Sequence, residues 1–147
     1  MNIQVMSRAK AQQFSYSAHH ATIAIISISD CDKEFPNLRN NPGNGIVYQS
    51  KFHFDDVDDG DTHCITDTDA MGIATFVFSI KDKANLLIVH CEAGVSRSAG
   101  VAAAIMKFID DDDTPIFDSY EYRPNMTCYK KVLRALFELC KDCGSSL

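Results

Sequence analysis

One stretch of the chain constrains its fold more than any other: an apolar run that leads through a turn of small residues into a helix. Residues 86–89 are apolar at every position, which predicts a strand buried on both faces, as in a parallel sheet. Apolar residues recur at helical spacing between Val101 and Ile109, which predicts an amphipathic helix. Between the two, Ala93 and Gly94 are small enough to let the backbone curl. A strand, a tight turn and a helix in this order are typical of an α/β fold.

The rest of the chain alternates strands and helices in the same way. Further strands are expected at residues 3–6, 22–28 and 46–54, and further helices at residues 7–14, at residues 68–82 and from about Asn125 onward. The last helix is expected to carry one apolar stripe, formed by Tyr129, Val132, Leu133, Leu136, Phe137 and Cys140. The run 22–28 is apolar and β-branched, so it should be central in the sheet. The predicted fold class is α/β, with a central, mostly parallel sheet flanked by helices. At 147 residues the chain has the length of one domain, so residues 1–147 are expected to form a single unit.

The charge balance excludes some classes of partner. The chain carries 14 Lys and Arg against 20 Asp and Glu, a formal net charge of −6. Such a surface repels nucleic acid and anionic membranes, so neither is an expected partner. No apolar run approaches the roughly 20 residues that span a bilayer, and residues 1–14 lack the apolar core of a signal peptide. The expected location is cytoplasmic, where cysteines are kept as reduced thiols.

Cys91 and Arg97 lie six positions apart within the strand, turn and helix described above. The spacing alone means little, because roughly 0.2 such pairs arise by chance in a chain of this composition. Cys128 and Arg134 form a second pair at the same spacing, but no glycine lies between them and a helical apolar stripe runs through them. The second pair is interpreted as part of an ordinary helix. The strand, turn and helix around Cys91 therefore distinguish the first pair from the second.

A loop wound between a strand and a helix turns successive backbone N–H groups toward one point, and the helix adds the positive end of its dipole. An oxyanion is the ligand that such a loop favours. The expected phosphate-binding positions are those of the loop and the arginine that follows it: Glu92, Ala93, Gly94, Val95, Ser96 and Arg97.

The same N–H groups favour thiolate over thiol, so Cys91 is expected to be a nucleophile rather than an inert buried thiol. Arg97 has a planar guanidinium that matches two phosphate oxygens, which the point charge of a lysine cannot do. His90 is expected to support the loop from the end of the strand. Ser98 places a hydroxyl where it could donate to the sulfur when sulfur leaves. These four residues are the candidate catalytic groups around the loop.

A thiolate that attacks phosphorus also requires an acid to protonate the departing oxygen. Asp56 is the preferred candidate, because it follows the strand that ends near Phe54 and lies 91 − 56 = 35 residues before Cys91. Asp55, Asp58 and Asp59 are alternatives from the same acidic stretch. After the first step, the deprotonated acid could activate water to hydrolyse a phosphocysteine.

The segment from His90 to Ser98, His-Cys-Glu-Ala-Gly-Val-Ser-Arg-Ser, resembles the signature of the protein tyrosine phosphatase superfamily, and its small loop residues are most similar to the dual-specificity type. The resemblance implies a cysteine phosphatase fold, hydrolysis through a cysteinyl phosphate, and no metal or cofactor. It also implies an upstream aspartate as general acid, in agreement with Asp56. More loosely, the segments 27–29 and 123–125 look like features of small members of the family.

The resemblance implies a phosphorylated protein or peptide as substrate, and two alternatives stay open. Phosphatases of phosphoinositides, nucleotides or RNA ends use a similar loop, although theirs tends to contain basic residues and residues 92–96 contain none. A non-catalytic phosphopeptide-binding module is less favoured, because such modules usually lose the cysteine or the arginine. The preference between phosphotyrosine and phosphoserine or phosphothreonine, and the oligomeric state, are not determined by these residues.

Other cysteines give weaker signals. Cys140 and Cys143 resemble a redox pair or half of a zinc site, but no second pair lies at suitable spacing, so a loose tail is favoured. His63 and Cys64 are interpreted as loop residues rather than ligands. Cys91 is expected to oxidise reversibly, because accessible thiolates oxidise readily.

Overall fold

A computed structural model describes residues 1–39 and 45–142, and in these residues strands and helices alternate along the chain. The elements are β1 (Asn2–Ser7), α1 (Arg8–Ser15), β2 (Ile23–Ser29), β3 (Ile46–His53), α2 (Asp67–Ile80), β4 (Leu86–Cys91), α3 (Arg97–Asp110), α4 (Thr114–Phe117) and α5 (Met126–Asp142). The strands of the described chain form one sheet in the order β1-β4-β2-β3, and every neighbouring pair is parallel. The prediction of an α/β fold with a mostly parallel sheet is confirmed.

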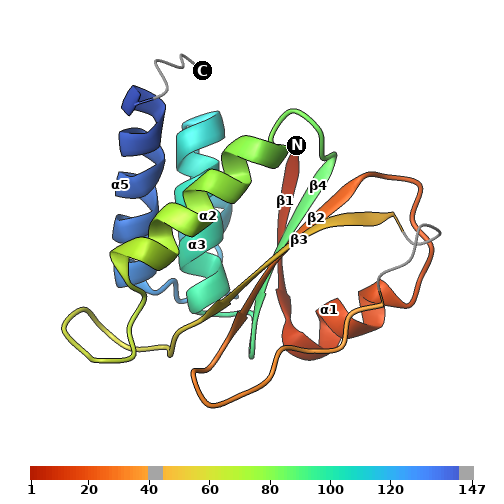
Figure 1. Ribbon diagram of the computed structural model, residues 1–147, viewed down its shortest axis with the longest axis horizontal. Coiled ribbons are helices and arrows are strands. Elements are labelled where there is room, and N and C mark those ends of the chain that lie inside the picture. The colour runs from red at the N-terminus through yellow and green to blue at the C-terminus, as the bar shows by residue number, and fades with distance from the viewer. Residues whose placement is uncertain (40–44, 143–147) are drawn as a thin grey trace.

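Helices cover both faces of this sheet. Figure 1 shows α2, α3 and α5 on one side of the strands and α1 on the other. The side chains of β2 alternate between the two resulting cores: Ala24, Ile26 and Ile28 pack toward the larger cluster, and Ile23 and Ile25 toward the smaller one. All seven residues of β2 are buried. The prediction that this strand is central and buried on both faces is therefore confirmed.

The helix starts also follow the sequence. Ser7 caps α1, because its hydroxyl accepts a hydrogen bond from the Lys10 N–H at 3.1 Å. Thr66 caps α2, and the Asp69 carboxylate accepts from the Thr66 N–H in return at 3.0 Å. Asp thus replaces the more usual Glu in a complete capping box. The start of α5 at Met126 agrees with the prediction of a start near Asn125.

One expectation about the helices is wrong, and one short helix was not predicted. The helix after the loop was expected to be amphipathic, but α3 is buried on nearly all sides from Arg97 to Met106, because it lies between the sheet and α5. Its run of Ala102, Ala103 and Ala104 allows this close packing. In addition, α4 was not expected, since a helix of four residues has too few turns to show a periodic pattern.

The stripe predicted for the last helix is rotated in the structure. The residues buried in α5 are Cys128, Val132, Ala135 and Leu136. Phe137, which was expected in the stripe, is 49% exposed, although its ring contacts the edge of Phe108. The sequence prediction placed the large apolar side chain of Phe137 in the buried stripe. In the structure α5 packs closely against α3, so the smaller residues Cys128 and Ala135 are buried instead.

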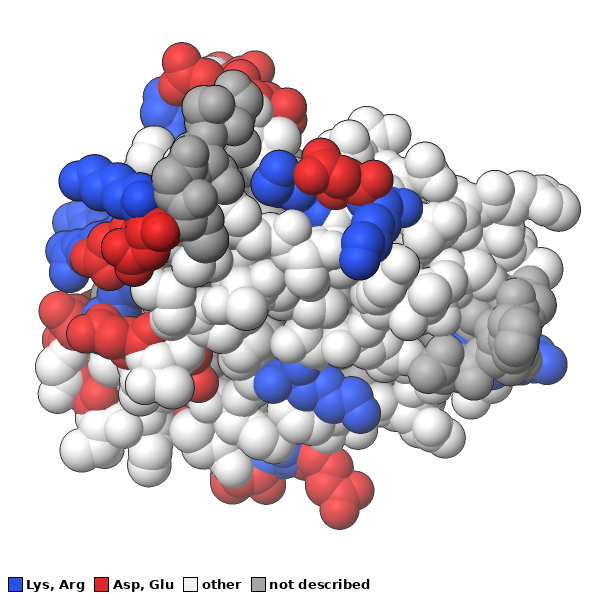
Figure 2. Space-filling view, turned by 45° about the horizontal axis from the view of Figure 1, so that its top comes forward, with Lys and Arg blue, Asp and Glu red and all other residues white. Residues whose placement is uncertain are grey.

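The surface carries charges of both signs. On the face shown in Figure 2, acidic and basic side chains lie in mixed clusters, with uncharged surface between them. Opposite charges in close proximity limit the field that either sign projects into solvent. No helix within the described residues is long and apolar enough to cross a membrane.

Gly100 sets the distance between α3 and α5. A Cβ at this position would collide with the backbone oxygen of Asn125, and it would lie 3.1 Å from the Cβ of Cys128. Gly72 in α2 differs, because its added Cβ would meet only the ring edge of Phe52, at 2.9 Å. A backbone atom cannot move aside as a ring can.

We predict that Gly100→Ala lowers the free energy of unfolding by about 1–3 kcal/mol, the usual cost of overpacking. Gly72→Ala is the matched control, because it gains the helix propensity of Ala, worth up to about 1 kcal/mol, and displaces only a flexible side chain. Urea denaturation of both variants measures the difference. A Gly100→Ala protein as stable as the parent would contradict this account of the helix contact.

Candidate active site

The loop that contains the candidate nucleophile lies at the carboxyl end of β4, between that strand and α3. Gly94 has φ +71°, a conformation that favours glycine. A Cβ there would lie 2.5 Å from the backbone nitrogen of Ser7 and 2.6 Å from the carbonyl carbon of Met6. The Arg8 N–H donates to the Glu92 carbonyl at 3.0 Å. The end of β1 therefore supports the loop from behind and fixes its path.

Cys91 faces a cavity of about 500 Å³, although only 2% of its surface is exposed. Its sulfur lies 3.0 Å from the Ser98 hydroxyl oxygen, in the first turn of α3. The cavity is bordered by the loop and by residues from two other segments: Asp56, Cys91, Glu92, Ala93, Val95, Ser96, Arg97 and Arg123. Cys91 thus borders the cavity while almost all of its surface is buried.

His90 lies on the buried side of the loop. It is fully buried, and its Nε2 lies 2.7 Å from the Ser27 hydroxyl on the neighbouring strand β2. Its Nδ1 lies 3.5 Å from the carbonyl oxygen of Cys91, which can only accept, so this nitrogen is assigned the proton and Ser27 donates to Nε2. Burial lowers the pKa of His90 to about 4. A neutral imidazole thus connects the end of β4 to β2.

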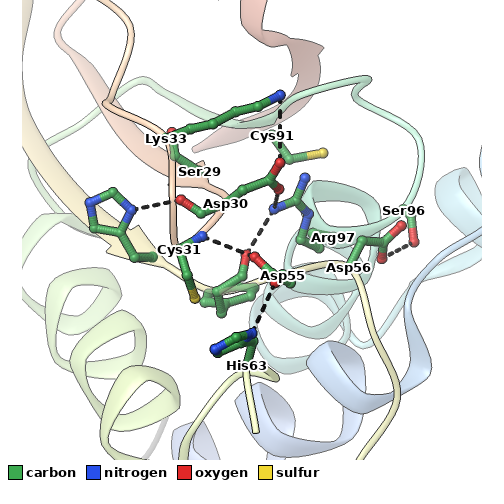
Figure 3. A network of polar contacts seen from close by, with 12 residues as sticks. Ser29, Asp30, Cys31, Lys33, Asp55, Asp56, His63, Cys91, Ser96 and Arg97 are labelled. Atoms are coloured by element: carbon green, nitrogen blue, oxygen red, sulfur yellow. Dashed lines mark hydrogen bonds and ion pairs between the residues drawn. The ribbon is translucent and has the colours of Figure 1, made fainter. Parts of the chain in front are cut away.

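Arg97 is held by a set of acceptors that the sequence analysis did not identify. Its Nη1 donates to the Asp30 carboxylate at 2.7 Å and to the Phe54 carbonyl at 2.8 Å. Figure 3 shows Asp30 between the side chains of Lys33 and Arg97. The Arg97 Nε is buried and has no hydrogen-bond partner among the described residues. One nitrogen of the guanidinium, Nη1, is held by two acceptors, whereas Nε is unsatisfied.

Asp56 is the acidic residue that the structure brings to the same cavity as Cys91. Its Oδ1 accepts from the Ser96 hydroxyl at 2.7 Å, as Figure 3 shows, and from the Asn125 side-chain amide at 2.9 Å. The Asn125 amide also donates to the Val57 carbonyl, and its oxygen accepts from the Cys128 N–H at the start of α5. Both donors to the carboxylate use one oxygen. Oδ2 is therefore the oxygen available for a proton.

The alternative acids point elsewhere. Asp55 accepts from the Cys31 N–H at 2.9 Å and lies 3.4 Å from His63 Nδ1. The hydrogen bond from the Cys31 N–H holds the pKa of Asp55 below its ordinary value. Asp59 lies 3.5 Å from Lys131 and borders a different cavity. Asp58 is exposed and does not border the cavity of Cys91.

The start of α3 leaves backbone donors unused. Ser96 precedes the helix, but its hydroxyl makes no cap and is bonded to Asp56 instead. The N–H groups of residues 93–96 donate no hydrogen bond to any residue of the described chain. Unpaired donors at a helix start, with the positive end of the dipole, favour an anion. Together with Arg97 they give the cavity the character of an oxyanion site.

Solved structures of several phosphatases are similar in fold to this chain. Human DUSP28 superimposes with a TM-score of 0.61 over 95% of this chain and 94% of that chain, at 15% sequence identity. A mouse dual-specificity phosphatase complexed with zinc tungstate gives a TM-score of 0.59 over 96% and 84% of the two chains, at 17% identity. PTPMT1 in complex with PI(5)P gives 0.58 over 97% and 94%, at 14% identity.

The chain has the fold of the small dual-specificity phosphatases. No family model and no curated protein matches its sequence, so the evidence for this fold is structural. In this fold, Cys91 and Arg97 bracket the loop between the central strand β4 and α3.

The second pair, Cys128 and Arg134, lacks every feature of the first. Both lie within α5, as expected. Burial raises the pKa of Cys128 to about 12, so its thiol stays protonated, and Arg134 is exposed and does not border the cavity of Cys91.

The other cysteine signals do not add a site. Cys140 lies in α5, and Cys143 lies outside the described residues. His63 and Cys64 lie in the loop before α2, as expected. Within residues 1–39 and 45–142, no group of three or more potential ligand side chains is arranged to bind a metal ion.

Sequence reasoning did not identify Asp30, and it noted the segment 123–125 without placing Arg123 or Asn125 in the site. Asp30 and Asn125 lie 67 and 69 residues from the side chains that they contact. The sequence did contain a signal for Asp30. It directly follows the buried strand β2, so it lies at the same edge of the sheet as the loop after β4.

We predict that His90 makes stability depend on pH. The folded pKa of about 4 lies below the ordinary value of 6.5, so the unfolded chain takes up a proton first as pH falls. Stability is lost between about pH 6.5 and pH 4, by on the order of 3 kcal/mol. His90→Asn should flatten this slope in urea denaturation at several pH values. His20→Asn removes an exposed histidine and should leave the slope unchanged, and an unchanged slope in His90→Asn would refute the assignment.

Proposed function

We propose that residues 1–147 are the catalytic domain of a phosphoester hydrolase that acts through a cysteinyl-phosphate intermediate. One observation carries the proposal: a single cavity is bordered by Cys91, Arg97 and Asp56, which supply a nucleophile, a cation for the phosphate and an acid. The unsatisfied Nε of Arg97 and the unpaired loop N–H groups add support, since both are donors that a phosphate oxygen would satisfy. A cytoplasmic location would keep the nucleophile reduced.

In the first step, the thiolate of Cys91 attacks phosphorus and forms a P–S bond while the P–O bond to the leaving group breaks. The N–H groups of the loop and Arg97 bind the equatorial oxygens, on which charge accumulates in the transition state. Asp56 gives the proton on Oδ2 to the departing oxygen. Ser96 and Asn125 hold the other oxygen of this carboxylate, so they fix the direction in which the proton is presented.

In the second step, a water molecule attacks the phosphorus of the cysteinyl phosphate. Asp56, now ionised, takes a proton from this water as its oxygen bonds to phosphorus, and the P–S bond breaks. The departing sulfur is a thiolate, and the Ser98 hydroxyl at 3.0 Å is in place to donate to it. Inorganic phosphate leaves, and the acid and the nucleophile are restored to their starting states.

The proposed substrate is a phosphorylated protein or peptide. Residues 92–96 contain no basic side chain that would attract the additional phosphates of a phosphoinositide or nucleotide. The alternative keeps one point of support, because PTPMT1, whose fold is similar, was crystallised with PI(5)P. A binding module without activity is disfavoured because both Cys91 and Arg97 are present and border one cavity.

The decisive test is turnover of p-nitrophenyl phosphate. We predict that the parent protein releases p-nitrophenol without added metal and that Cys91→Ser lowers kcat to background, because the weaker nucleophile cannot form the intermediate. Rapid acid quenching of the parent protein with radiolabelled substrate should trap label on the protein, and Cys91→Ser should trap none. Turnover that survives Cys91→Ser would exclude the mechanism.

The acid is tested by comparing two neighbouring aspartates. Asp56→Asn should lower kcat about 10²–10⁴-fold for phosphotyrosine, the usual contribution of a general acid, and by less for p-nitrophenyl phosphate, whose leaving group needs little protonation. Asp55→Asn is the matched control, since Asp55 is bonded to Cys31 and does not border the cavity. Asp55→Asn should therefore leave the ratio of kcat for phosphotyrosine to kcat for p-nitrophenyl phosphate unchanged. Equal effects of the two substitutions would invalidate the choice of Asp56.

A further inference from the structure

Arg123 is an exposed cation at the rim of the cavity that contains Cys91. Its backbone N–H donates to the Val95 carbonyl at 3.0 Å, so its main chain is fixed relative to the loop. Its guanidinium makes no ion pair or hydrogen bond with any residue in the described part of the chain. This is notable because two acids, Asp56 and Glu92, border the same cavity. The side chain is therefore free to bind a ligand group.

Of the other three charged side chains that border the cavity, Arg97 and Asp56 have partners within the protein. Arg97 is held by Asp30 and faces the position of the reacting phosphate, and Asp56 is held by Ser96 and Asn125. Glu92 directly follows the nucleophile, whereas Arg123 is bonded to Val95 near the end of the loop. The rim thus carries an anion beside the start of the loop and a cation beside its end. A substrate with a second negative charge would be attracted in one orientation and repelled in the other.

We propose that Arg123 is a specificity-determining residue that binds a second anionic group on the substrate peptide, next to the phosphate that is hydrolysed. This inference rests on the proposed function of the cavity. The planar guanidinium suits a carboxylate or a phosphate, so the group is an acidic side chain or a second phosphorylated residue. The volume of about 500 Å³ lies in the range of ~300–1,000 Å³ typical of ligand pockets, which leaves room for more than one phosphate.

The test measures peptide binding to the Cys91→Ser protein, which cannot turn substrate over. Three phosphotyrosine peptides are compared: one with neutral neighbours, one with glutamate neighbours and one with a neighbouring phosphoserine. The measured quantity is the ratio of affinities, anionic over neutral. We expect a ratio of about five, which corresponds to one partly exposed ion pair, and we expect Arg123→Met to reduce it to about one.

Lys130→Met is the matched control. Lys130 is also an exposed cation without a partner among the described residues, it lies in α5, and it does not border the cavity of Cys91. The substitution removes the same charge, so it tests whether general surface charge explains the preference. The ratio should persist in this variant.

Preference for the glutamate peptide identifies a carboxylate as sufficient, and preference for the phosphoserine peptide alone identifies a doubly phosphorylated substrate; both support the proposal. A ratio of one in the Cys91→Ser protein, a ratio that survives Arg123→Met, or one that is also lost in Lys130→Met overturns it. If the parent protein fails to hydrolyse any phosphoester while the Arg123-dependent ratio persists, the proposed hydrolase activity is wrong and the second anion site stands.

Discussion

Two backbone hydrogen bonds connect the loop between β4 and α3 to the segment that begins α5, and the rest of the site depends on them. The Arg123 N–H donates to Val95 and the Asn125 N–H to Ser96, each at 3.0 Å. The absence of a side chain at Gly100 permits this approach. Because the same segment carries the amide that binds Asp56 and the cation at the rim, the acid and the rim are both positioned relative to the loop. The packing of α5 against α3 therefore also sets the position of the Asp56 carboxylate.

The buried guanidinium of Arg97 has one donor without a hydrogen-bond partner among the described residues. Burying a charge is costly unless it is paired and its donors are bonded. Asp30 and the Phe54 carbonyl satisfy one nitrogen, but Nε stays unpaired at a residue that is only 4% exposed. An unsatisfied buried donor costs stability. Under the proposed function, a phosphate oxygen that accepts from Nε would remove this cost.

Features that depend on local sequence were predictable, and features that depend on distant segments were not. The strand, turn and helix around Cys91 are contiguous, so their pattern predicted β4, the loop and α3, with Arg97 and Ser98 at the start of that helix. The choice between Asp55 and Asp56 depends on which way two adjacent side chains point, and a pattern carries little information on that. The roles of Asp30 and Asn125 require knowledge of which strand ends and helix starts meet in space. The burial of α3 on nearly all sides likewise follows from its neighbours.

The parallel pairing of β1 with β4 joins residue 2 to residue 86 and residue 7 to residue 91. Gly94 adopts its left-handed conformation against the end of that first strand. Contacts between such distant parts of a chain form slowly, because a large loop must close first. The loop after β4 thus cannot take this path in a collapsed intermediate that lacks β1. A newly made molecule completes the cavity around Cys91 only after residues 2–7 have paired with residues 86–91.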